Sequence, residues 1–185
     1  NHEIRYASFG SSVTYGVGLG DREKEAYAWR LSNSDSARGM NFGIRAVGPN
    51  YPASCIYTMI GEQEFDVIVL EYFMRGLEGL MTFALRIRER FPNAIIIMTK
   101  LWGPYQYFQT GHVSLTDWAS KNGFGRNYIH DPLFSKAFLA YGEDKFRDIY
   151  GSPNSPLTRY HEAVAKEIGA YVVKMPRSEH AGGPG

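Results

Sequence analysis

The chain has 185 residues, enough for one domain with a substantial core, and 44% of them are hydrophobic, which excludes a disordered polypeptide. Its twenty basic and nineteen acidic residues are scattered, so the net charge of +1 gives no electrostatic basis for binding nucleic acid or anionic lipid. No apolar run approaches the roughly 18–20 residues that span a bilayer, and the single cysteine, Cys55, excludes an internal disulfide. The five histidines lack the paired spacing of a metal site, so we expect neither a metal nor a cofactor.

The first predicted strand is residues 4–9 (IRYASF), which alternate with the period of two that is typical of strands. It breaks at once into Gly10-Ser11-Ser12, before a helix can begin. A strand that ends in glycine and small hydroxyl residues places them at the carboxyl edge of a sheet, where open α/β sheets keep their sites. Ser12 is therefore the candidate nucleophile.

Strands and helices then alternate along the chain. The expected strands are residues 4–9, 40–47, 65–73, 94–98 and 170–174. The expected helices lie within residues 21–32, from Pro52 onward, at 77–91, and from Pro156 to a glycine end at Gly169. This alternation predicts an α/β fold, a three-layer αβα sandwich with a five-stranded parallel sheet in the flavodoxin-like order 2-1-3-4-5. In that order the turn that carries Ser12 lies beside the end of the third strand, at the switch point.

We expect a single domain over residues 1–185, cut from a longer polypeptide at both ends, since the chain begins without Met and ends in Ala-Gly-Gly-Pro-Gly. The sequence does not indicate a compartment. Residues 102–154 are rich in Tyr, Phe, Trp, Gly and Asn and exceed ordinary loop lengths, so we expect an insertion with helices near 113–121 and 134–141. An aromatic-rich insertion also suits an interface with a protein partner.

Three segments, in the right order within residues 4–99, resemble the SGNH or GDSL hydrolases. Residues 9–16 (FGSSVTYG) resemble the first block, Gly-Asp-Ser-(aliphatic)-Thr-x-Gly, with Ser11 in place of Asp and Ser12 as the nucleophile. Residues 41–46 resemble the second block, and residues 66–72 resemble the strand that leads into the third. The resemblance implies a three-layer αβα fold and hydrolysis of a carboxylic ester, such as an acyl or acetyl ester on a small molecule or a glycan.

The resemblance also assigns the remaining site residues and shows where this chain departs from the family. Ala46 aligns with the second-block glycine, whose N–H helps to form the oxyanion hole, and Phe73 and Arg75 replace the third-block Gly and Asn. The expected oxyanion hole is the N–H groups of Ser12 and Ala46 with the charge of Arg75. His180 is the candidate base, although Arg177 stands where the family has Asp. His161 lies on an apolar helix face and is expected to be a packing residue.

Two other functions stay open at this point. A non-catalytic SGNH-like domain that serves as a binding module or as a subunit of an assembly would explain the loss of the third-block Gly and Asn. A flavodoxin-like nucleotide binder is the weaker reading, because residues 16–20 (GVGLG) lack both the phosphate-loop Lys and the Gly-x-Gly-x-x-Gly spacing.

Overall fold

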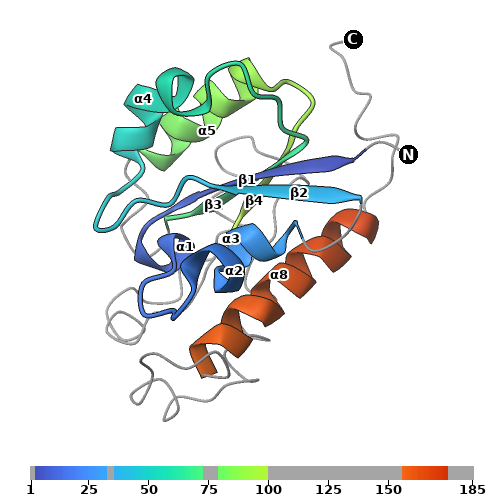
Figure 1. Cartoon of the computed structure of the whole chain (residues 1–185). Coiled ribbons are helices and arrows are strands. Elements are labelled where there is room, and N and C mark those ends of the chain that lie inside the picture. The colour runs from blue at the N-terminus through green and yellow to red at the C-terminus, as the bar shows by residue number, and fades with distance from the viewer. Residues whose placement is uncertain (1–2, 33–35, 73–78, 100–155, 175–185) are drawn as a thin grey trace, which may run out of the picture.

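Four parallel strands form the sheet in the part of the chain that the computed structural model describes, which is residues 3–32, 36–72, 79–99 and 156–174 (Figure 1). The strands are β1 (Ile4–Gly10), β2 (Ala37–Asn41), β3 (Val67–Glu71) and β4 (Ile95–Met98). The helices are α1 (Ser12–Tyr15), α2 (Arg22–Glu25), α3 (Tyr27–Arg30), α4 (Asn50–Ile60), α5 (Leu80–Arg90) and α8 (Pro156–Lys174). The insertion predicted at 102–154, with its two helices, lies outside the described residues.

The strand order is β2-β1-β3-β4, and every pairing is parallel. In this register Tyr6 of β1 lies opposite Gly39 on one side and Val67 on the other. β1 is therefore an inner strand with partners on both sides. The predicted α/β class and the predicted order of the first four strands are confirmed.

Helices cover both faces of the sheet, which gives the three layers that the alternation predicts (Figure 1). α4 and α5 pack on the face that carries Phe9 and Ile68, whereas α3 and α8 pack on the face that carries Tyr6 and Val69. The two faces alternate residue by residue along β3, all of whose side chains are buried. This double burial explains why the strand has a continuous apolar run.

The predicted strand at 170–174 is wrong, because α8 continues through Gly169 to Lys174. Its buried side chains around Gly169 recur every three or four residues, at Val164, Ala165, Ile168 and Val172, while Val173 is 77% exposed. That spacing matches a helix face and does not match the alternation of a strand. Packing on the sheet thus outweighs both the β propensity of the Val-Val pair and the helix-ending tendency of Gly169.

The second strand also differs from the prediction of 40–47, since β2 begins at Ala37 and ends at Asn41. The side chain of Asn41 accepts the N–H of Gly43 at 2.8 Å, which turns the chain out of the sheet. The apolar residues after Asn41 suggested a longer strand, but they pack on the core instead of extending the sheet. Phe42, for example, stacks on Phe9 with ring centroids 4.9 Å apart.

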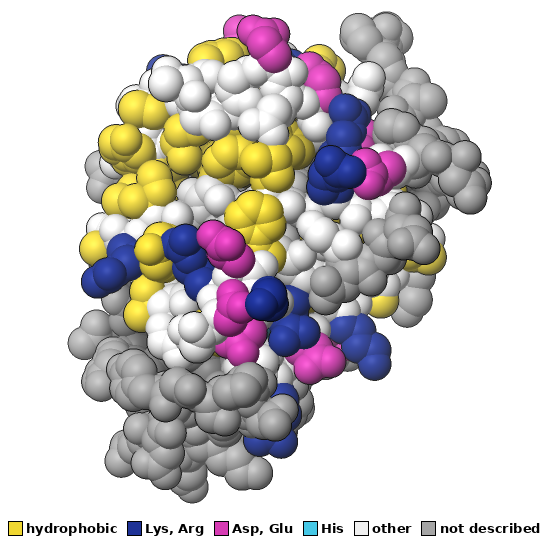
Figure 2. Space-filling model, in the orientation of Figure 1, with side chains coloured by type: hydrophobic (Ala, Val, Ile, Leu, Met, Phe, Trp, Pro, Cys, Tyr) yellow, Lys and Arg dark blue, Asp and Glu magenta, His cyan; other side chains and the backbone are white. Residues whose placement is uncertain are grey.

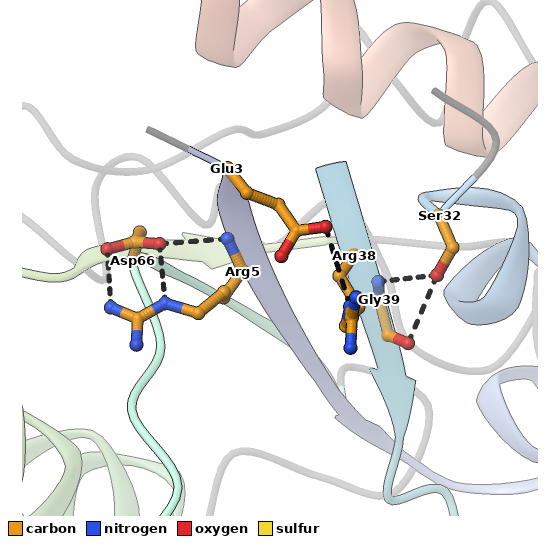
Figure 3. A network of polar contacts seen from close by, with 6 residues as sticks. All are labelled: Glu3, Arg5, Ser32, Arg38, Gly39 and Asp66. Carbon is orange, nitrogen blue, oxygen red and sulfur yellow. Dashed lines mark hydrogen bonds and ion pairs between the residues drawn. The ribbon is translucent and has the colours of Figure 1, made fainter. Parts of the chain in front are cut away.

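At the amino edge of the sheet, polar contacts hold β1 to the start of β3 (Figure 3). The carboxylate of Asp66 accepts the backbone N–H of Arg5 at 2.8 Å and two guanidinium N–H groups at 3.1 and 3.2 Å. On the other side, the hydroxyl of Ser32 accepts the N–H of Gly39 at 2.6 Å and donates to its carbonyl at 3.2 Å. The Asp66 contacts therefore anchor the amino end of β1, and the Ser32 contacts anchor the middle of β2.

Hydrophobic side chains gather over α4 and α5 on the molecular surface (Figure 2). Tyr51 and Tyr57 of α4 are 53% and 52% exposed, and Leu85 of α5 is 53% exposed. Within the described ranges, no helix combines the length and the apolar character that crossing a bilayer requires. The outer layer on this side is therefore an amphipathic pair of helices with a partly apolar outer surface.

His161 on α8 is a packing residue, as predicted from its place on an apolar helix face. Its side chain is 1% exposed, and its Nδ1 accepts the backbone N–H of Tyr27 at 3.0 Å. The imidazole stacks on the Tyr27 ring. Burial, together with the nearby charge of Arg30, lowers the pKa of His161 to about 3. The neutral imidazole is therefore the form that joins α8 to α3.

This buried imidazole should make the protein less stable in mild acid. The pKa of His161 is about 3 when folded and 6.5 when unfolded, so its contribution is complete above pH 6.5 and is lost as the pH falls toward 3. His161→Asn keeps an acceptor near Nδ1 and cannot titrate. Urea unfolding should show the stability advantage of the wild type shrinking by about 2 kcal/mol between pH 7 and pH 5. A difference in unfolding free energy between wild type and His161→Asn that is the same at both pH values would contradict the low pKa of His161.

Candidate active site

Ser12 lies at the carboxyl edge of the sheet, where the sequence predicts it. β1 ends at Gly10, and Ser12 is the first residue of the single-turn helix α1. Ser11 is buried, whereas Ser12 is only half-buried. Because β1 has β2 on one side and β3 on the other, the turn that carries Ser12 lies at the switch point of the sheet.

The loop after β2, which contains the second block, packs directly on this turn. Asn41 donates from Nδ2 to the carbonyl of Thr14 at 2.7 Å, and the N–H of Ile44 donates to the carbonyl of Gly10 at 3.0 Å. A Cβ on Gly43 would lie 2.8 Å from the carbonyl carbon of Thr14, so only glycine allows this approach. The structure thus brings the first and second blocks together.

Ala46 lies in the same loop, two residues after the contact of Ile44 with Gly10. Its φ is +60°, and it is the one non-glycine residue with positive φ in the described part of the chain. This is the left-handed conformation that glycine adopts at no steric cost. Alanine therefore occupies a backbone conformation suited to the glycine that the resemblance aligns with it, and it keeps the N–H.

Glu71 is a residue of this edge that the sequence reasoning missed. It is the last residue of β3 and only 1% exposed, and its Oε2 faces three donors of the Ser12 turn. These are the N–H of Ser11 at 3.3 Å, the N–H of Thr14 at 3.4 Å and the hydroxyl of Thr14 at 3.0 Å. The sequence feature that could have identified Glu71 is an acidic residue at the end of the most apolar strand, since acidic residues are rarely buried without partners.

Two phenols flank this carboxylate and remain protonated. Burial, reinforced by the charge of Glu71, raises the pKa of Tyr27 and of Tyr72 well above 10. The Tyr27 hydroxyl lies 2.8 Å from Oγ1 of Thr14. Because the hydroxyl of Thr14 donates to Glu71, Tyr27 must donate to Thr14. The chain of hydrogen bonds therefore runs from Tyr27 through Thr14 to the carboxylate.

The other predicted site residues, Arg75 and His180, lie outside the described residues, as do Phe73 and Arg177. His161 is the one histidine within the described ranges, and its Nδ1 accepts the N–H of Tyr27, so the neutral imidazole carries its proton on Nε2. Neither nitrogen is then free to take a proton from Ser12. Nor do the described residues group three or more His, Cys, Asp or Glu side chains that could hold a metal ion. The base for Ser12 stays a prediction.

No protein-family model matches the sequence, and no curated protein sequence matches it. Solved structures do match its fold. A two-domain esterase active on acetylated mannans has a TM-score of 0.64 at 12% identity, over 100% of this chain and 52% of that chain. This chain thus spans about half the length of that esterase.

Two further structures match along nearly their whole length. A member of the lipolytic G-D-S-L family from Veillonella parvula has a TM-score of 0.61 at 12% identity, over 93% of this chain and 100% of that chain. The acetylxylan esterase Axe2 from Geobacillus stearothermophilus has a TM-score of 0.63 at 12% identity, over 95% of this chain and 96% of that chain. The chain therefore has the fold of the SGNH, or G-D-S-L, hydrolases, as its sequence motifs predict.

Proposed function

We propose that this chain is an SGNH-type serine ester hydrolase with Ser12 as its nucleophile. The observation that carries the proposal is the position of Ser12, which is half-buried at the start of α1, two residues after the end of β1, and lies against the second-block loop. That position is the switch point of a fold shared with esterases. The acetylated mannans and acetylxylan named for two of the neighbours suggest acetyl esters of polysaccharides as the substrate class.

The proposed reaction is acyl transfer through a covalent intermediate. Oγ of Ser12 attacks the ester carbonyl carbon while a base, proposed to be His180, takes the hydroxyl proton. The negative charge on the carbonyl oxygen is held by the N–H groups of Ser12 and Ala46 and by the charge of Arg75. The intermediate collapses, the alcohol leaves with the proton from the base, and water then releases the acid and restores Ser12.

A second candidate is a non-catalytic SGNH-like domain that binds a protein partner through residues 102–154. The observation that favours it is the replacement of the third-block Gly and Asn by Phe73 and Arg75. Losing one oxyanion donor lowers rates by about 100- to 1,000-fold in enzymes that depend on it. The two candidates differ in one property, the reactivity of Ser12.

A fluorophosphonate probe separates them, because it reacts with activated serines and largely ignores ordinary ones. We expect the longest natural form of the protein to be labelled, and Ser12→Ala to abolish the labelling. Hydrolysis of an acetyl ester should fall with it, by about 1,000-fold or more. Ser54→Ala, which removes an exposed serine on α4, is the matched control and should label like the wild type. A folded full-length protein that is not labelled would favour the non-catalytic domain.

The conformation of Ala46 gives a separate test of the second block. Ala46→Gly should stabilise the fold by about 0.5–1 kcal/mol, since relief of the left-handed strain exceeds the added chain entropy. It should leave Ser12 labelling unchanged, because the N–H is kept. The same substitution at Ala170, an exposed residue of α8, should instead destabilise by about 1 kcal/mol. Thermal unfolding of both variants measures this, and a destabilised Ala46→Gly would count against the left-handed assignment.

A further inference from the structure

We propose that Glu71 is a positioning residue whose buried carboxylate fixes the turn that carries Ser12. Its effect on reactivity rests on the proposed function of Ser12, whereas its hold on the turn is a property of the fold. Glu71 would act through the backbone of the turn and the side chain of Thr14, without touching the substrate.

The first argument is the way in which α1 begins. Ser11 is the N-cap residue of this helix, but its side chain makes no capping hydrogen bond. An N-cap side chain ordinarily accepts the N–H of the second or third helical residue, and the third here is Thr14. Oε2 of Glu71 accepts that N–H instead, at 3.4 Å, and also the N–H of Ser11 at 3.3 Å. The carboxylate of a neighbouring strand thus caps the helix on both sides of Ser12.

The second argument is the space that the chain provides for this carboxylate. Glu71 lies opposite Gly10 in the pairing of β3 with β1. A Cβ on Gly10 would collide with Oγ1 of Thr14 and lie 2.8 Å from Oε2 of Glu71. Glycine is therefore required at the end of β1 for the carboxylate to reach the turn. The Thr14 side chain and the Glu71 carboxylate together therefore exclude any larger residue at the glycine before the serine pair.

The third argument is the electrostatic cost of the arrangement. A carboxylate that is 1% exposed is expensive to bury unless strong hydrogen bonds stabilise it. The hydroxyl of Thr14 donates to Oε2 at 3.0 Å and is itself oriented by Tyr27. Hydrogen bonds to an ionised acceptor are roughly twice as strong as neutral ones. The charged carboxylate therefore holds the N–H groups of Ser11 and Thr14 more rigidly than a neutral side chain of the same shape would hold them.

The variant Glu71→Gln tests whether the carboxylate fixes the turn, since glutamine keeps the shape of the side chain and removes its charge. Residue-resolved amide hydrogen exchange should show the N–H groups of Thr14 and Tyr15 exchanging about tenfold faster than in the wild type. Asp66→Asn is the matched control, because Asp66 accepts a backbone N–H at the opposite end of the same strand pair. It should speed exchange at Arg5 and leave Thr14 unchanged. Unaltered exchange at Thr14 in Glu71→Gln would overturn the proposal.

The rate at which Ser12 is labelled tests whether Glu71 affects the reactivity of this serine. With the fluorophosphonate probe, Glu71→Gln should be labelled at least about tenfold more slowly, and Asp66→Asn within about twofold of the wild type. With an ester substrate the loss should fall on kcat and leave KM unchanged, because Glu71 does not contact the substrate. Equal labelling rates in Glu71→Gln and wild type would overturn the proposal. A wild type that does not label at all would instead overturn the proposed function, and hydrogen exchange would still decide the role of Glu71.

A second pair of variants covers the case in which Glu71→Gln does not fold. Thr14→Val removes the hydroxyl that donates to Glu71 and keeps the shape of this buried side chain. Thr14→Ser, the control, keeps the hydroxyl. We expect Thr14→Val to slow labelling and to speed exchange of the Thr14 N–H by about fivefold, and Thr14→Ser to stay within about twofold of the wild type. If Thr14→Val behaves like the wild type in both measurements, the positioning role is excluded.

Discussion

The register of β1 is the constraint on which the rest of this structure depends. β1 pairs with β2 and β3, is covered by helices on both faces, and leads directly into the turn of Ser12. Two carboxylates hold β1 at its two ends. Asp66, just before β3, does so at the amino edge, and Glu71, the last residue of β3, does so at the carboxyl edge. A slip of one residue would exchange the faces of Tyr6 and Ala7, and it would move Ser12 away from the second-block loop.

The two carboxylates do this in different electrostatic surroundings. Asp66 is 30% exposed and pairs with the guanidinium of Arg5, so the pair contributes about 1 kcal/mol or less. Glu71 is buried, and the contacts that join it to the Ser12 turn come from N–H and O–H groups. A carboxylate in that position is stable only while the turn keeps its shape. The amino end of β1 is therefore held by a solvated ion pair, and the carboxyl end by a network in which each part depends on the others.

The sequence predicts the order of the first four strands and the place of Ser12, because both follow from local patterns. The first strand shows as an alternating run that Gly10-Ser11-Ser12 interrupts, and the third shows as a continuous apolar run. The failures have tertiary causes. Residues 170–174 have a strand-like composition, but the sheet face that buries Val172 makes them helical. The role of Glu71 depends on donors about sixty residues away in the chain, and periodicity carries no information about such pairs.

Two features that lower the stability of this fold lie at the same edge of the sheet. The left-handed conformation of Ala46 and the buried charge of Glu71 both destabilise the chain relative to simpler alternatives. Both lie at the carboxyl edge, around the turn of Ser12, whereas the amino edge is closed by the partly exposed ion pair of Arg5 and Asp66. Local strain and buried charge of this sort cluster at functional sites, where geometry matters more than stability. Their position around Ser12 supports the role proposed for this serine.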